Sequence, residues 1–183
     1  MNIIWKIRLP RVLMAGILGG ALALSGFLLQ TSFSNPIAGP YVLGISSGAK
    51  MMVALAMIIF LKYYTLVSSY ILIIAAFIGS MLSIGFILLL ARKIRNMATL
   101  LVGGIMIGYI CSAVTDFVVT FAEDSDIVNL HGWSQGSFSG MSWSNVRVAS
   151  VIIAVAVILT FLLSKPIGAY QLGEAYAQSM GVN

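Results

Sequence analysis

The chain has 183 residues, of which 60% are hydrophobic and only 8% are charged, and its formal net charge is +5. Soluble domains carry about one quarter charged residues, so this composition excludes a soluble protein and indicates an integral membrane protein. The Lys and Arg residues stand mostly singly between apolar stretches, without interleaved aromatic rings, which argues against a nucleic-acid partner. We therefore expect an all-α polytopic transmembrane helical bundle.

About five apolar stretches approach the length of roughly 20 residues that a helix needs to cross a bilayer. In chain order they are Val12–Phe33, Ile45–Leu61, Leu66–Ala91, Ala98–Ala122 and Val148–Ser164. We interpret the first as a retained helix, because its apolar run is long for a signal peptide and no small-residue cleavage site follows. The second is the weakest candidate, since it is short and carries Lys50. Pro166 is expected to end the last one.

Two further segments are too polar or too short to span. His131–Trp143 mixes polar and aromatic residues and has glycines at intervals of four, which predicts a short interfacial or re-entrant helix. Tyr170–Val182 has the apolar spacing of a small amphipathic helix. Between the fourth span and the first of these segments, Glu123, Asp124 and Asp126 predict an aqueous loop.

The positive charges alone leave the orientation open. With Arg92, Lys93 and Arg95 placed in the cytoplasm, five crossings divide the ten cations equally between the two sides. The cytoplasmic group would be Lys50, Arg92, Lys93, Arg95 and Lys165, and the external group would be Lys6, Arg8, Arg11, Lys62 and Arg147.

No motif in the chain predicts enzymatic chemistry. The segment from Gly44 to Lys50 resembles a phosphate-binding loop, but it has three residues between its glycines instead of four and no Ser or Thr after the lysine. We reject nucleotide binding, so a partner must handle any ATP. His131 has no second metal ligand at a suitable spacing, and Cys111 is interpreted as a small buried residue. We predict no cofactor, no metal and no catalytic residue.

Asp116 and the small residues before it on the fourth span form the candidate translocation pathway. Gly104, Gly108, Ser112 and Asp116 recur at intervals of four, a pattern that suits either packing against another helix or the wall of a pore. An acid inside a span is a functional candidate, but Asp116 is equally compatible with a helix-end carboxylate near the outer interface.

Four blocks carry a resemblance to a known family. They are I-R-L-P-R with the segment G-G-A-L-A-L-S-G-F-L-L-Q-T-S-F-S-N-P-I-A-G-P-Y-V-L-G-I-S-S-G-A, then L-L-V-G-G-I-M-I-G-Y-I-C-S-A, W-S-Q-G-S-F-S-G-M-S-W and Q-L-G-E-A-Y-A-Q-S-M-G-V. From Ile7 onward the chain resembles the permease subunits of type II ABC importers for iron-siderophore complexes, haem and cobalamin.

The resemblance implies a multi-pass permease in the cytoplasmic membrane of a bacterium or archaeon. Such a permease pairs with a second permease copy, binds two ATPase subunits and receives its substrate from an extracytoplasmic binding protein. It also implies that the R-L-P-R block faces outside, where Arg8 and Arg11 would dock the binding protein. Interfacial arginines that only anchor a helix end are the alternative.

The resemblance further implies that residues 170–182 form a cytoplasmic coupling helix, in which Leu172, Gly173, Glu174 and Ala177 contact an ATPase. A gate would lie at Met97, Ala98 and Thr99, just before the fourth span. Family members are longer, with a helix before R-L-P-R and more spans after the coupling helix, so we expect residues 1–183 to be a single but incomplete permease domain. Two other functions stay open: a non-transporting membrane fragment or assembly element, and an ion-coupled transporter that uses Asp116.

Overall fold

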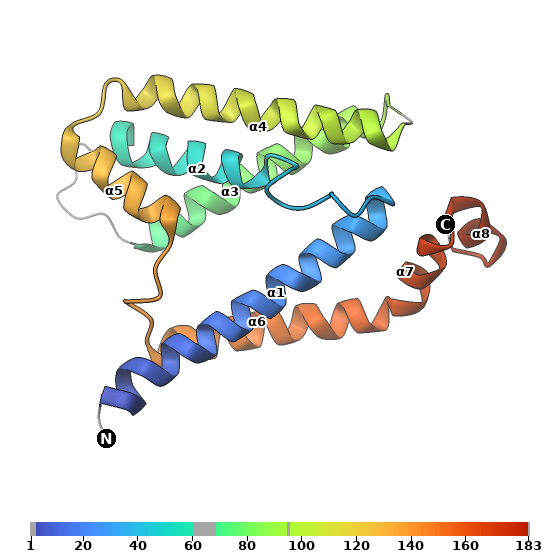
Figure 1. Ribbon diagram of the computed structural model, residues 1–183, viewed down its shortest axis with the longest axis horizontal. Coiled ribbons are helices and arrows are strands. Elements are labelled where there is room, and N and C mark those ends of the chain that lie inside the picture. The colour runs from blue at the N-terminus through green and yellow to red at the C-terminus, as the bar shows by residue number, and fades with distance from the viewer. Residues whose placement is uncertain (1–2, 61–68, 95, 183) are drawn as a thin grey trace. The chain divides into compact units, whose positions relative to one another are not determined.

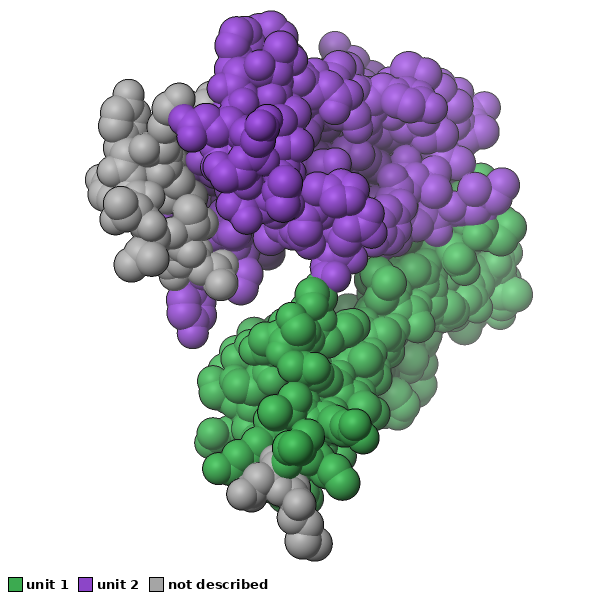
Figure 2. Space-filling model, turned by 60° about the vertical axis from the view of Figure 1, so that its left-hand side comes forward, with its two compact units in different colours: residues 1–36, 137–183 green, residues 37–136 purple. Residues whose placement is uncertain are grey.

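The computed structural model describes residues 3–60, 69–94 and 96–182, and every regular element among them is a helix (Figure 1). The chain separates into two compact units, one of residues 1–36 with 137–183 and one of residues 37–136 (Figure 2). Within the described ranges, four helices are long and apolar enough to cross a membrane: Ile4–Phe33, Tyr70–Ala91, Met97–Val119 and Trp143–Leu162. A shorter apolar helix covers Ile45–Ile58. The all-α expectation is confirmed, while Leu61 and Leu66, which bound two predicted spans, lie outside the described residues.

The first helix begins earlier than predicted. A π-helical turn, η1 (Ile4–Arg8), runs directly into α1 (Leu9–Phe33), so the basic residues of the leader are already helical. Pro10 explains the wide turn, because its ring would clash with the carbonyl four residues earlier in a regular α-helix. At the other end, Ser34 is left-handed (φ 46°) and the Asn35 N–H donates to the Gln30 carbonyl over 3.1 Å, which closes the helix before Pro36.

In the same unit, α6 (Trp143–Leu162) lies beside α1 and runs in the same direction (Figure 1). The start of α6 touches η1, directly before α1, where the Trp143 Nε1 donates to the Trp5 carbonyl over 3.0 Å. The helix that follows α6 reaches the far end of α1, where the Gln171 Nε2 donates to the Thr31 Oγ1 over 3.2 Å. The two long helices of this unit are therefore parallel.

Two short helices replace the single amphipathic helix predicted over Tyr170–Val182, which is wrong in its bounds. They are α7 (Ser164–Gln171) and α8 (Glu174–Ser179). Gly173 separates them with φ 112° and ψ 152°, a backbone conformation outside the helical region. Pro166 also differs from the prediction, because it lies in the first turn of α7, where its missing N–H removes no helical hydrogen bond.

The second unit is built around α2 (Ile45–Leu55), which packs against both α3 (Ser69–Ala91) and α4 (Met97–Val119). A second π-helical turn, η2 (Ala56–Phe60), continues α2. A cluster of buried aliphatic side chains lies in this unit and consists of Val53, Ala54, Ala56, Ile58, Leu72, Ala75, Val118 and Leu130. Because α2 contacts both long helices, it sets the spacing between them.

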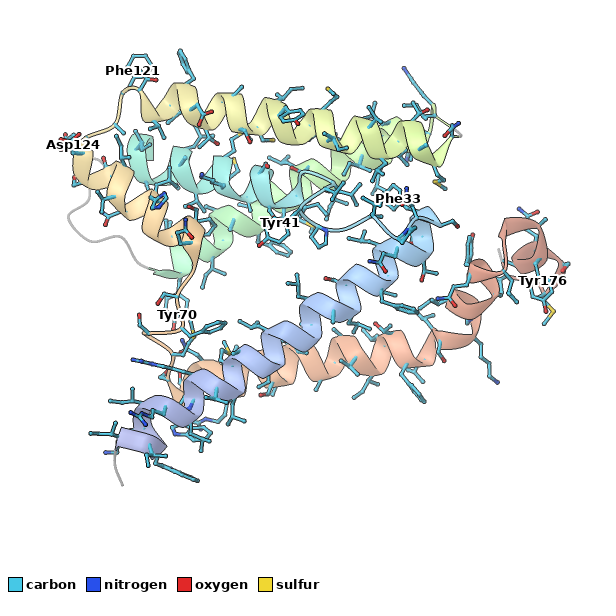
Figure 3. The ribbon with its side chains drawn as sticks, viewed as in Figure 1. Phe33, Tyr41, Tyr70, Phe121, Asp124 and Tyr176 are labelled. Atoms are coloured by element: carbon cyan, nitrogen blue, oxygen red, sulfur yellow. The ribbon has the colours of Figure 1, made fainter. Side chains whose placement is uncertain are left out.

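The last element of this unit corrects two predictions. Residues 124–126 open helix α5 (Asp124–Gln135) instead of forming an aqueous loop, and Phe121 and Asp124 mark the turn that leads into it (Figure 3). Acids in a first turn are stabilised by the helix dipole. The helix ends at Gly136 (φ 73°), so the predicted helix over His131–Trp143 is wrong beyond Gln135. The later glycines of that segment therefore do not stack on one helical face.

Candidate functional site

The small residues of α4 divide between two faces of the helix. Gly104 and Gly108 are buried against the residues that lead into α2: a Cβ atom on Gly104 would lie 3.0 Å from Leu43 Cδ2, and one on Gly108 would lie 3.2 Å from Gly44 Cα. Ser112 is exposed. A step of four residues turns a helix about 40° beyond a full circle, so the spacing drifts away from the contact. The buried face instead follows Leu100, Gly104, Gly108, Cys111, Thr115 and Val118.

Asp116 lies one turn before the end of α4 and is exposed. The Thr120 Oγ1 donates to the Asp116 backbone carbonyl over 3.0 Å, which satisfies one of the carbonyls near the helix end. This position agrees with the alternative of a helix-end carboxylate, which needs no partner inside the membrane. The pathway role predicted for Gly104, Gly108, Ser112 and Asp116 stays a prediction.

The predicted gate residues form the exposed first turn of α4. The Asn96 side chain caps this turn, because its Oδ1 accepts from the Ala98 N–H over 2.9 Å and from the Thr99 N–H over 3.3 Å. Met97 opens the helix and is also exposed. The cap fixes where α4 starts, and gating by Met97, Ala98 and Thr99 remains a prediction.

A set of contacts between α2 and α3 was missed by sequence reasoning. A Cβ atom on Gly48 would lie 2.8 Å from the Gly79 carbonyl oxygen and would also meet the buried Ser83 Oγ. A Cβ on Gly79 would lie 2.8 Å from the Gly48 carbonyl carbon and would meet the Gly48 carbonyl oxygen. The two backbones touch because neither residue has a side chain. The signal was present in α3 as two small residues four apart, Gly79 and Ser83, which both meet Gly48.

Gly44, which the sequence placed in a rejected phosphate loop and in the first block of the family resemblance, joins α2 to α4. Its φ of 70° favours glycine, and a Cβ atom there would lie 2.7 Å from the Gly108 backbone nitrogen and 2.8 Å from the Gly104 carbonyl oxygen. Gly44 therefore meets the same two α4 glycines that were predicted for the pathway.

The two candidate docking arginines differ in their surroundings. The Arg11 Nη2 donates to the Ser139 carbonyl over 2.6 Å, which ties α1 to the segment just before α6. Six residues before Arg11, the ring of Trp5 packs against that of Trp143 in a tilted arrangement, with 5.6 Å between the ring centroids and 39° between the ring planes. Arg11 therefore has a structural partner inside its own unit, whereas the Arg8 side chain is exposed.

The predicted coupling residues surround the break between α7 and α8. Leu172 is 68% exposed, whereas Ala177 is fully buried. The Ala177 N–H donates to the Gly173 carbonyl over 3.0 Å, and its own carbonyl accepts from the N–H groups of Met180 and Val182. Glu174 begins α8, and its side chain lies outside the described part of the structure. Of the side chains described here, Leu172 is accessible to a partner and Ala177 is not.

Long apolar helices in close backbone contact, followed by two short helices, define a polytopic helical membrane protein. The chain belongs to the FecCD transport family, whose sequence profile matches residues 1–183. It is 39% identical over 182 residues to the hemin transport system permease protein HmuU of Yersinia pestis, covering 98% of this chain and 54% of that protein. It is 34% identical over 179 residues to the vitamin B12 import system permease protein BtuC of Klebsiella pneumoniae, covering 98% of this chain and 53% of that protein.

The fold has a solved counterpart. The chain superposes on a metal-chelate type ABC transporter in an inward-facing conformation with a TM-score of 0.85 and 26% identity, covering all of this chain and 57% of that one. The chain spans about half the length of the curated relatives it matches.

Proposed function

We propose that this chain forms part of the permease subunit of an ABC importer that carries an iron chelate, haem or cobalamin across the cytoplasmic membrane. The observation that carries the proposal is the family match over the whole chain, together with relatives described as permeases for hemin and for vitamin B12. Separate ATPase subunits would hydrolyse the ATP, an extracytoplasmic binding protein would deliver the substrate, and a second permease copy would complete the pathway.

The parallel course of α1 and α6 favours a topology of five membrane crossings, one more than the four long helices alone would give. Two spans that run in the same direction must be separated by an odd number of crossings, and among the described residues between them only α3 and α4 are long spans. The combined α2 and η2 would supply the third intervening crossing. With 11 and 5 residues they extend roughly 24 Å, slightly less than the apolar thickness of a bilayer.

Reconstitution into liposomes tests this proposal. The full-length permease, assembled with its ATPases, should accumulate haem, vitamin B12 or a ferric siderophore only when ATP is inside and the binding protein is outside. A complex whose ATPase subunits cannot hydrolyse ATP is the control. Uptake that continues in that control under a proton gradient would favour ion coupling, and absence of uptake with all three substrates would overturn the proposal.

Arg8 is expected to contribute to docking through its exposed charge. Replacing it by glutamine should weaken binding of the extracytoplasmic protein about two- to fivefold, which is typical for one exposed ion pair. The loss should shrink at high salt because exposed charges are screened. Lys6→Gln, at another exposed cation of η1, is the matched control. Calorimetric titration at low and high salt measures both variants, and equal losses would show that only net charge matters.

A further inference from the structure

One polar contact links the short helices to the end of α1. The Gln171 Nε2, on the last residue of α7, donates to the Thr31 Oγ1 over 3.2 Å. Thr31 is 9% exposed and lies in the last turn of α1. A single residue lies between Gln171 and Gly173, the residue directly before α8. The contact thus joins the last turn of α1 to the end of α7, next to the break that precedes α8.

The packing around this hydrogen bond is open on both sides. A surface groove of about 410 Å³ borders it and is lined by Phe27, Gln30, Thr31, Ser34, Asn35, Pro36 and Gln171. A second surface groove of about 440 Å³ runs between α7 and α1, and its lining includes Leu28, Thr31, Ile167 and Tyr170. Thr31 lines both grooves. Tightly interlocked side chains resist sliding, whereas side chains that border open grooves hold two helices in register less firmly.

We propose that the hydrogen bond between Thr31 and Gln171 is the joint through which movement of α8 reaches α1. This inference rests on the proposed function and on the ATPase contact that the family resemblance implies for residues 170–182. The grooves beside the contact leave α7 free to shift against α1, and the hydrogen bond fixes which position the two helices hold. Thr31 and Gln171 are positioning residues in this account, because neither is argued to touch the substrate.

The geometry separates this role from general packing. Ser32, the next residue of α1, borders the same second groove, but its Oγ donates to the Leu28 carbonyl over 2.8 Å inside its own helix. The Ser32 hydroxyl group therefore bonds within α1, whereas the Thr31 hydroxyl group accepts a hydrogen bond from α7. The proposal depends on this difference. Thr31→Val keeps the shape of the side chain and removes only the hydroxyl group, so the apolar packing should survive.

The test measures how many substrate molecules enter liposomes per ATP hydrolysed. It uses the full-length permease complex with whichever of haem, vitamin B12 or ferric siderophore the unmodified complex imports. Thr31→Val and Gln171→Leu should each lower this ratio about two- to tenfold, the range expected for losing one partly buried hydrogen bond. Co-purification of the ATPases should be unchanged. Thr31→Ser retains the hydroxyl group and should keep the ratio of the unmodified complex. The double variant Thr31→Val with Gln171→Leu should be no worse than either single variant.

The outcomes separate the two proposals. If the unmodified complex imports nothing with ATP, the proposed function fails and the joint fails with it. If the unmodified complex imports but both variants keep its ratio, the joint alone is overturned. Ser32→Ala is the matched control, and a loss as large as that of Thr31→Val would also overturn the proposal. Should Thr31→Val not fold, Gln171→Leu decides alone, because Gln171 is exposed and substitutions at exposed positions usually change stability little.

Discussion

Gly79→Ala is expected to destabilise the unit of residues 37–136 by at least about 3 kcal/mol, the upper part of the range for overpacking. The new Cβ atom would lie 2.8 Å from the Gly48 carbonyl carbon and 2.8 Å from Met52 Cγ, and would also meet the Gly48 carbonyl oxygen. The side chain of Met52 can turn away, but the backbone of Gly48 can move only with the whole of α2. Separating α2 from α3 would open the core that both helices share.

Gly85→Ala provides the matched control on the same helix. A Cβ atom at Gly85 meets nothing within 4 Å, so alanine there should be neutral or slightly stabilising because it favours a helix over glycine. Thermal unfolding of the permease in detergent, followed by circular dichroism, measures both variants. Equal unfolding temperatures for Gly79→Ala and Gly85→Ala would show that the two backbones do not touch in the protein.

Gly173→Ala is expected to release the ATPase subunits while leaving the transmembrane helices folded. The conformation of Gly173, with φ 112° and ψ 152°, is one that residues with a Cβ atom rarely adopt, at a cost of about 1–3 kcal/mol. Since nothing lies within 4 Å of that Cβ, relief comes from rotation of the backbone and not from movement of a neighbour. Such a rotation would reorient α8 relative to α7.

Co-purification of the ATPases with a tagged full-length permease measures this effect, and we expect about a tenfold loss, as a strain of this size would give. Gly168→Ala is the control, because Gly168 is inside α7 and its Cβ would also meet nothing within 4 Å. The unfolding temperature should be the same for both variants. If Gly173→Ala retains the ATPases, the α7–α8 segment does not form the proposed contact with them.

The sequence predicts the long spans of this fold well, but it does not predict the short helices and their ends. The long spans were found because hydrophobicity is a local property, and the predicted end at Ala91 coincides with the end of α3. The bounds of α5 were missed because Asp124 and Asp126 suit a helix start as well as a loop, and Gly136 decides the end only through its backbone angle. The break at Gly173 was missed for the same reason, since a glycine in a sequence does not display its φ.

For the candidate site, the sequence did not predict which residues are buried or what their side chains contact. Spacing of four joined Gly104, Gly108, Ser112 and Asp116 into one stripe, whereas the structure buries the first two and exposes the others. The R-L-P-R block suggested two equivalent arginines, but a hydrogen bond from Arg11 to Ser139, 128 residues away, gives the two different surroundings. No local pattern contains such a partner.

The sequence by itself determined that this protein lies in a lipid bilayer, that it is all-helical and which family it belongs to, because the lengths of apolar stretches and the order of motifs are local properties of the chain. Only the tertiary structure decided which glycines bring α2, α3 and α4 into backbone contact, and that α1 and α6 run in parallel. The physical reason is that a glycine contributes to packing through the side chain it lacks. What occupies that space is set by residues distant in the sequence.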